Sequence, residues 1–208
     1  MLDQTKNMQG ATFNHLRLTM PELRMNVGAS MIDGLIFNLD NGRGQSARWA
    51  IEELPVLDLF CGVGTSGLEM ADRVFQRGGR RYIGIDIGAA PFDSANSDRE
   101  PCKVLRTLKR SPMNGTVASL IPGDVFKLLS SVPRQSVNVL MNMVDDTIIQ
   151  EEAEVIRLAE SIHKVVARGG FAMGYLSRPL AVLARRHPQC YTNKSVGDVT
   201  FLCRTRGG

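Results

Sequence analysis

Short apolar runs alternate with stripes of apolar residues at helical spacing along the chain from residue 56 onward. The runs are rich in aliphatic residues and bounded by turn-forming residues, a pattern that predicts strands. The predicted strands cover residues 56–60, 81–85, 116–121, 137–143 and 170–176. Because helical segments lie between most of them, the pattern predicts βαβ units and an α/β fold, with a parallel sheet that carries helices on both faces.

Two of the predicted helices have well-marked ends. An apolar stripe over residues 68–75 stops at Gly78-Gly79, and a longer stripe over residues 153–166 stops at Gly169-Gly170. Glycine is favoured just after the last turn of a helix, because it adopts left-handed backbone angles without strain. Both segments are therefore predicted to be helices that connect parallel strands.

The C-terminal part of the chain follows a different pattern. A short helix is predicted around residues 179–186, and apolar runs over residues 190–196 and 199–205 flank the turn Gly197-Asp198. Strands joined by so short a turn pair in antiparallel fashion. The sequence thus predicts a parallel sheet that is completed by an antiparallel C-terminal hairpin.

The N-terminal region lacks this alternation. Residues 25–39 place Met31, Leu35 and Leu39 on one side of a predicted helix, and the glycines of residues 41–44 end it. We expect residues 1–50 to form a helical cap over the open end of the sheet. Residues 51–208 are expected to form one ligand-binding domain.

Composition narrows the class of protein. A chain of 208 residues with 43% hydrophobic and 22% charged residues fits a single globular domain. No apolar run is long enough to cross a membrane, the N-terminus lacks a signal-peptide pattern, and the four cysteines form no C-x-x-C pair, so a cytoplasmic location is expected. The net charge of +4 mildly favours an anionic partner, but the basic residues are scattered along the chain.

The stretch VLDLFCGVGTSGLEMA reads as a strand, a glycine-rich turn and a helix. Gly62, Gly64 and Gly67 fit the G-x-G-x-x-G pattern, in which the backbone approaches a ligand at the N-terminus of a helix. Asp86 ends the second predicted strand, where a carboxylate accepts hydrogen bonds from ribose hydroxyls. These features suit either a nicotinamide dinucleotide or an adenosyl ligand.

Two further carboxylates favour the adenosyl ligand. Asp58 precedes the glycines, and it would repel a pyrophosphate but attract the sulfonium and ammonium groups of S-adenosylmethionine. Asp124 follows the third strand, where the adenine amino group needs an acceptor, and the adjacent Val125 is placed to pack on the ring. Asp124 is also a candidate N-cap for the helix that follows, and the two roles are compatible.

The series VLDLFCGVG, YIGIDI, IPGDVFKLL and ARGGFAMGY, within residues 54–206, resembles the ordered motifs of class I S-adenosylmethionine-dependent methyltransferases. The resemblance implies a Rossmann-like fold with a mostly parallel seven-stranded sheet and a C-terminal antiparallel hairpin. It also implies S-adenosylmethionine as the cofactor, held by residues 51–208. The residues that the resemblance places around the cofactor are Asp58, Gly62 and Gly64 at the methionine end, Asp86 with Ile87 at the ribose, and Asp124 with Val125 at the adenine.

In this family the methyl acceptor meets the cofactor beyond the fourth strand, here VNVLMNMVDDTIIQ. The phrases MIDGLIFNL and LDLFCGVGTSGLE resemble small-subunit ribosomal RNA guanine-N2 methyltransferases, but their Asp-Pro-Pro-aromatic motif is replaced by Asp145-Asp146-Thr147. This difference speaks against methylation of a base amine. Asp145 is instead the candidate general base, or it holds Mg²⁺ together with Asp146, or it caps the next helix.

Other reactive side chains are assigned structural roles. Cys61 is small and apolar and suits the turn, and Pro101-Cys102 follows the second strand rather than the fourth, where a nucleophilic cysteine would be needed. The histidines His15, His163 and His187 share no spacing, and no protein metal site is predicted among them.

The sequence as a whole predicts a methyltransferase that transfers a methyl group to an oxygen or nitrogen of a small molecule. No membrane partner is expected. Two alternatives stay open: an RNA methyltransferase, favoured by the basic pI of about 9.0, and a non-catalytic S-adenosylmethionine-binding module that acts with a partner protein.

Overall fold

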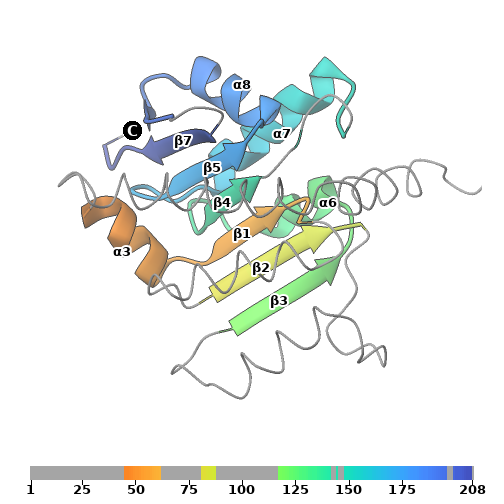
Figure 1. The fold of residues 1–208 in the computed structure, drawn as a ribbon, viewed down its shortest axis with the longest axis horizontal. Coiled ribbons are helices and arrows are strands. Elements are labelled where there is room, and N and C mark those ends of the chain that lie inside the picture. Colours follow the sequence, from red (N-terminus) through yellow and green to blue (C-terminus); the bar gives the residue numbers. More distant parts are fainter. Residues whose placement is uncertain are drawn as a thin grey trace, which may run out of the picture.

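The computed structural model describes residues 45–61, 81–87, 117–141, 144, 148–195 and 199–207 of the chain. Helices and strands alternate through these ranges, as Figure 1 shows. In chain order they are α3 (Gln45–Glu53), β1 (Val56–Leu59), β2 (Arg81–Asp86), β3 (Val117–Pro122), α6 (Val125–Ser131), β4 (Asn138–Met141), α7 (Glu152–Val165), β5 (Phe171–Tyr175), α8 (Arg178–Arg186), β6 (Tyr191–Asn193) and β7 (Val199–Arg204).

The strands form one seven-stranded sheet in the order β3-β2-β1-β4-β5-β7-β6. The first five strands of this order pair in parallel, whereas β7 runs antiparallel to both β5 and β6. The prediction of a mostly parallel α/β sheet with a C-terminal antiparallel hairpin is therefore confirmed. The sheet is Rossmann-like, with the seven strands and the C-terminal hairpin that the resemblance implied.

The central strands β1 and β4 are buried along their whole length. Such continuous burial is expected of strands in a parallel sheet, because crossover helices cover the sheet on its faces. One of these layers is made by α6, α7 and α8, which follow β3, β4 and β5 and contact one another in series. Helix α7 turns an apolar stripe toward the sheet, and its buried residues are Val155, Leu158, Ala159, Ile162 and Val165. The helix itself is confirmed, but the stripe is rotated from the predicted one, because Ala153 is exposed and Ile156 is only half-buried.

Helix α3 is joined to the edge of the sheet where the parallel strands begin (Figure 1). The buried side chain of Asn138, at the start of β4, makes this joint: its Nδ2 donates to the carbonyl of Ala50 at 2.8 Å and its Oδ1 accepts from the amide of Phe171 at 3.1 Å. One side chain thereby links α3, β4 and the start of β5. Since α3 runs from residue 45 to residue 53, it crosses the predicted boundary between the cap and the ligand-binding domain.

Several predicted features lie outside the described residues. These are the glycine turn, the helix over residues 68–75, the helix over residues 25–39 and the turn Gly197-Asp198. Within the described ranges, no helix combines the length and the apolar character needed to cross a lipid bilayer.

Candidate cofactor site at the carboxyl ends of the strands

The carboxyl ends of β1, β2 and β3 lie side by side and are tied together by backbone hydrogen bonds. The amide of Cys61, just after β1, donates to the carbonyl of Ile85 at 3.1 Å, and the amide of Gly123, just after β3, donates to the carbonyl of Asp86 at 3.0 Å. In open α/β sheets, ligands bind outside the carboxyl ends of the strands. The bonds therefore fix three neighbouring strand ends at the edge where a ligand is expected.

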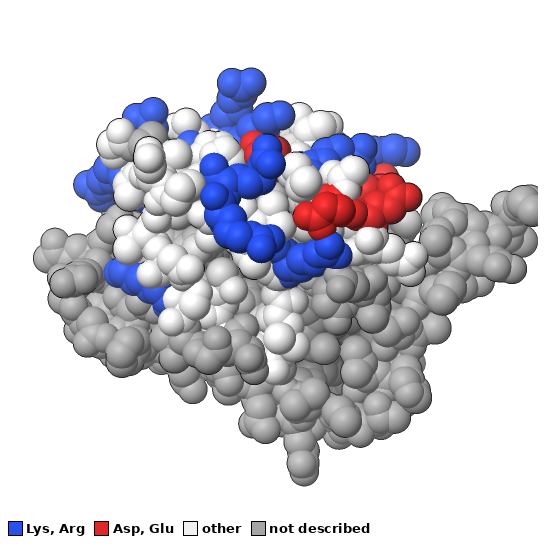
Figure 2. Space-filling view, turned by 90° about the horizontal axis from the view of Figure 1, so that it is seen from above, with Lys and Arg blue, Asp and Glu red and all other residues white. Residues whose placement is uncertain are grey.

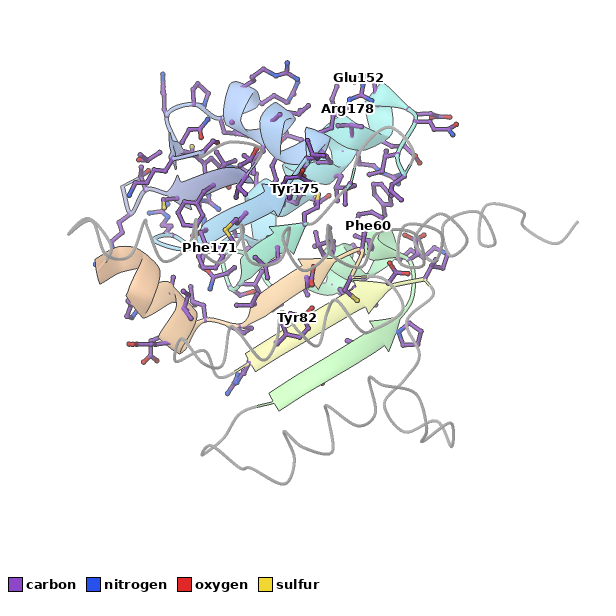
Figure 3. The ribbon with its side chains drawn as sticks, viewed as in Figure 1. Phe60, Tyr82, Glu152, Phe171, Tyr175 and Arg178 are labelled. Atoms are coloured by element: carbon purple, nitrogen blue, oxygen red, sulfur yellow. The ribbon has the colours of Figure 1, made fainter. Side chains whose placement is uncertain are left out.

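Asp58 lies inside this edge rather than on its surface. Its residue is 5% exposed, and its carboxylate accepts a hydrogen bond from the hydroxyl of Tyr82, which is fully buried on β2; Tyr82 is labelled in Figure 3. Burial raises the pKa of Asp58 from 3.8 to about 7; the Tyr82 hydrogen bond opposes this, and the charge of Asp86 adds to it. The carboxyl group of Asp58 is therefore partly protonated near neutral pH.

Asp86 ends β2 next to this buried pair, and Ile87 follows it. The charge of Asp86 contributes to the raised pKa of Asp58 and, after burial and Asp58 itself, to the raised pKa of Cys61. The strand register agrees with this, because Leu59 of β1 pairs with Ile85 and Asp86 is the next residue of β2. Ile87 is 37% exposed, and Ile121 on the neighbouring strand β3 is exposed to the same extent. Exposed aliphatic side chains beside a carboxylate offer a surface on which an aromatic base can lie.

Asp124 is the N-cap of α6, and its Oδ1 accepts from the amide of Phe126 at 2.8 Å. The capping role that the sequence proposed for Asp124 is therefore confirmed. A carboxylate has room for further donors, so the cap and a contact with an adenine amino group are compatible. Val125, the first residue of α6, is 3% exposed and belongs to the hydrophobic core, and its contact with an adenine ring stays a prediction.

Cys61 is a buried turn residue, 3% exposed. Burial raises the pKa of its thiol well above 9.0, so the thiol stays protonated at neutral pH and is a poor nucleophile. This position fits the structural role that the sequence suggested.

Two residues at the carboxyl ends of strands have positive φ although neither is glycine. Phe60 after β1 has φ 60°, and Leu176 after β5 has φ 45° with 48% of its surface exposed. Non-glycine residues at positive φ are strained and occur preferentially at functional sites. Leu176 was not identified from the sequence, because a single leucine does not indicate a positive φ. It extends the candidate site to the end of β5.

The acceptor side of the site is described only in part. Helix α8 begins with Arg178, whose amide donates to the carbonyl of the buried Val144 at 3.2 Å and whose side chain pairs with Glu152 of α7 (Figure 3). The hydroxyl of Ser177, which precedes α8, is buried without a hydrogen-bond partner among the described residues. Val144 precedes Asp145 and Asp146, which lie outside the described residues together with Gly62 and Gly64, so their assignments stay predictions.

No family model matches the chain, and no curated protein matches it. Solved structures do resemble it. A Corynebacterium glutamicum protein is 13% identical, with 93% of this chain and 97% of that one covered and a TM-score of 0.47.

Two further solved structures are methyltransferases by description. Magnesium protoporphyrin IX methyltransferase from Synechocystis PCC 6803, solved with bound SAH, is 12% identical over 86% of this chain and 83% of that one, with a TM-score of 0.48. A SAM-dependent methyltransferase from Aquifex aeolicus is 11% identical over 84% of this chain and 98% of that one, with a TM-score of 0.46. Because these TM-scores are low, the fold assignment rests on the order and pairing of the strands.

Proposed function

We propose that this protein binds S-adenosylmethionine at the carboxyl ends of β1, β2 and β3 and transfers its methyl group to a small-molecule acceptor. The observation that carries the proposal is the position of Asp58, buried on β1 and coupled to Asp86 at the end of β2. Two carboxylates at one site disfavour the negatively charged pyrophosphate of a dinucleotide. They favour a ligand that carries an ammonium and a sulfonium group.

The neighbouring strand ends suggest contacts for the rest of the cofactor. Asp86 is positioned to accept hydrogen bonds from the ribose hydroxyls, while Ile87 and Ile121 provide exposed apolar surface for the adenine. Methyl transfer is an in-line displacement at carbon, so the main task of the protein is to align the acceptor with the methyl group. Asp145 is proposed as the base that removes a proton from the acceptor.

Binding is tested first by calorimetry with S-adenosylmethionine, its demethylated product and NAD. We expect micromolar affinity for the first two ligands and far weaker binding of NAD. Asp86→Ala removes charge-assisted hydrogen bonds worth roughly 1.5–3 kcal/mol each, so affinity falls at least about tenfold. The matched control is Glu53→Ala, which removes an exposed carboxylate at the end of α3 and leaves affinity unchanged.

Transfer is tested separately from binding. The protein is incubated with methyl-labelled S-adenosylmethionine and fractions of a cell extract, and the fraction that gains label identifies the acceptor. Tight binding of the cofactor without transfer to any fraction would favour the non-catalytic module. A preference for NAD, or equal binding by Asp86→Ala, would contradict the cofactor assignment itself.

The surface charge provides one observation for the second candidate, an RNA methyltransferase. Figure 2 shows lysine and arginine side chains gathered on the side of the molecule where α7 and α8 lie. The exposed residues include Arg157 and Lys164 on α7, and Arg185 and Arg186 on α8. Arg185 and Arg186 close the last turn of α8, which points away from the carboxyl ends of the strands, and Arg186 is paired with Glu160.

A small molecule is therefore the preferred acceptor, and salt dependence tests this choice. Phosphate contacts release counterions, so RNA that is held only by surface charge dissociates as salt is raised. We expect weak, non-specific RNA binding that disappears near physiological ionic strength. Saturable binding of one RNA at that salt in a filter-binding titration would instead promote the RNA methyltransferase.

A further inference from the structure

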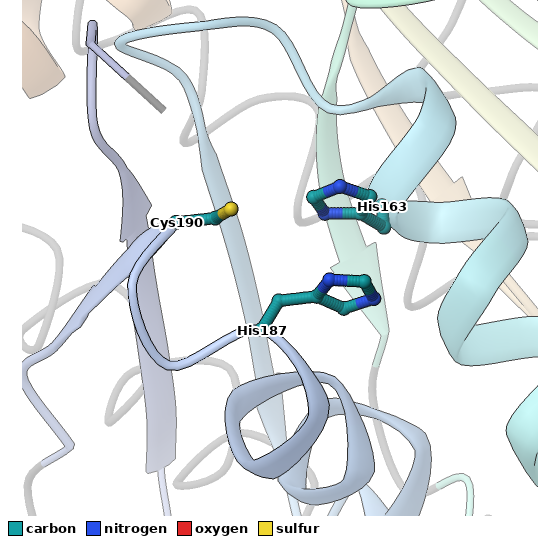
Figure 4. Close-up of side chains that lie close together, drawn as sticks. All are labelled: His163, His187 and Cys190. Carbon is teal, nitrogen blue, oxygen red and sulfur yellow. The ribbon is translucent and has the colours of Figure 1, made fainter.

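Two imidazoles and a thiol lie close together, as Figure 4 shows. They belong to His163 in the last turn of α7, His187 at the end of α8 and Cys190 in the turn before β6. One potential ligand atom from each residue lies within 4.8 Å of those of the other two, and all three residues are half-buried.

The backbone around this cluster is fixed by hydrogen bonds of its own. The amide of Cys190 donates to the carbonyl of His187 at 3.0 Å, and the carbonyl of Cys190 accepts from the amide of Thr205 at 2.9 Å. The carbonyl of His163 accepts from the Arg204 guanidinium at 2.6 Å. The three Cα positions are thus held by secondary structure and by β7, and they do not depend on the contacts among the three side chains.

Each imidazole already has one nitrogen engaged by an oriented partner. Nδ1 of His163 lies 3.3 Å from the Tyr191 hydroxyl, and Nε2 of His187 lies 3.2 Å from the Glu160 carboxylate. Metal-ligating histidines use one nitrogen for the metal and commonly donate the other N–H to a carboxylate or a similar group. Within the described part of the chain, Nε2 of His163 and Nδ1 of His187 have no hydrogen-bond partner.

We propose that His163, His187 and Cys190 form a Zn²⁺ site, with water in the fourth position. Two imidazole nitrogens and a thiolate are a donor set that Zn²⁺ favours. Bond lengths of about 2.0–2.3 Å place tetrahedral ligands about 3.5 Å apart, so the ligand atoms must approach one another by roughly 1 Å. The two rings are stacked at 3.8 Å between centroids, and they must turn about χ2 to aim at one ion, a torsion with a broad energy well.

The position of the site indicates what the metal does. Cys190 directly precedes Tyr191, the first residue of β6, which pairs with Arg204 near the end of β7. The neighbouring Cys203 pairs with Phe171, the first residue of β5, so the cluster lies at the edge where the parallel strands begin. That is the edge of the sheet opposite the cofactor site. A metal there would clamp α7, α8 and the C-terminal hairpin together, and its loss would act on stability rather than on cofactor binding.

The test is titration of the metal-free, reduced protein with Co²⁺ as a spectroscopic substitute for Zn²⁺. We expect saturation at one equivalent, a thiolate-to-Co²⁺ charge-transfer band and the visible absorption of tetrahedral Co²⁺. Zn²⁺ should displace the Co²⁺ and raise the unfolding temperature. Cys190→Ser should abolish the charge-transfer band, and Glu160→Ala, which removes the oriented partner of His187, should weaken binding roughly 10–100-fold.

Cys203→Ser is the matched control. Cys203 is a half-buried thiol on β7, outside the cluster, and its replacement should leave the band and the stoichiometry unchanged. Circular dichroism of each metal-free variant checks that it is folded. The proposal is overturned if the wild-type protein shows no saturable binding, if the band survives in Cys190→Ser, or if Cys203→Ser removes it.

Discussion

The hydroxyl of Tyr82 on β2 donates a hydrogen bond to the carboxylate of Asp58 on β1, and both residues are buried. Tyr82 stays protonated over the whole physiological range, because burial raises its pKa well above 10.0. It is therefore a permanent donor to a carboxyl group that changes its charge near pH 7. The pair makes the interior of the candidate site sensitive to proton binding.

Tyr82→Phe tests the strength of this hydrogen bond. A hydrogen bond to a charged group contributes roughly 1.5–3 kcal/mol, whereas one between neutral groups contributes about 1 kcal/mol. The substitution should therefore destabilise the fold more at pH 8, where Asp58 is ionised, than at pH 5. Urea unfolding at the two pH values measures the difference, and a double-mutant cycle with Asp58→Asn isolates the pairwise part. Equal losses at both pH values would show that Asp58 does not ionise in this range.

The raised pKa of Asp58 also predicts how stability depends on pH. The pKa is about 7 in the folded protein against 3.8 for the ordinary side chain, so between these values the folded state binds more protons than the unfolded state. The contribution of Asp58 to the free energy of unfolding is therefore fully present below about pH 4 and declines as pH rises toward 7. Asp58→Asn should remove this decline and should exceed the wild type in stability at pH 8.

Comparison of the wild type with Asp58→Asn separates the effect of this group from that of other groups whose titration changes stability. The pKa of Glu160 is lowered, mainly by its hydrogen bond from Arg186, and its stabilising contribution is lost as pH falls. Such effects are the same in wild type and Asp58→Asn and cancel in their difference. A difference in unfolding free energy that stays constant from pH 4 to pH 8 would contradict the raised pKa of Asp58.

Much of the fold could be predicted from local sequence pattern. The predicted strand over residues 81–85 became β2, and the strand over residues 116–121 became β3, each with ends within one residue. Helix α7 was predicted over residues 153–166 and spans Glu152–Val165. These elements could be predicted because their apolar periodicity and the turn-forming residues at their ends are visible within a short stretch of sequence.

The site was predicted less completely, because its decisive contacts join distant parts of the chain. Tyr82 is 24 residues from Asp58, and their bond depends on the pairing of β1 with β2. His163 and Tyr191 are 28 residues apart and meet only because β6 begins beside the end of α7. No spacing rule connects such residues, so the sequence predicts only a structural role for His163 in its helix and no shared role for the histidines.

Asn138 is a second residue whose importance depends on distant partners. It is fully buried, and its side chain bonds the carbonyl of Ala50 and the amide of Phe171. Asn138→Ala leaves the amide of Phe171 buried without this partner, whereas the carbonyl of Ala50 keeps its helical bond from the amide of Leu54, so we expect a loss of roughly 1–3 kcal/mol in unfolding free energy. Asn193→Ala is the control, because Asn193 also makes two hydrogen bonds but is exposed, and its loss should be under about 1 kcal/mol. Similar losses in the two variants would contradict the role of Asn138.

Gly174 on β5 marks a close approach of the strands on the acceptor side of the site. A Cβ at this position would lie 1.9 Å from the carbonyl oxygen of Met141, and a strand backbone cannot yield that much. Gly174→Ala should cost about 3 kcal/mol or more and reduce soluble expression. Gly207→Ala, where an added Cβ meets nothing within 4 Å, should change stability by less than about 0.5 kcal/mol. A Gly174→Ala protein of normal thermal stability would mean that β4 and β5 are further apart.

Binding of the proposed cofactor should release protons from Asp58, and this release can be measured. With a pKa of about 7, it is close to half protonated in the free protein at neutral pH. The ammonium and sulfonium groups of S-adenosylmethionine would favour the ionised carboxylate and lower its pKa, so binding at pH 7 should release about half a proton. Calorimetry in two buffers of different ionisation enthalpy measures this number, because the observed heat then differs between the buffers. Asp58→Asn should bind with the same heat in both buffers. Equal heats in both buffers for the wild type, with binding clearly measured, would separate Asp58 from the cofactor.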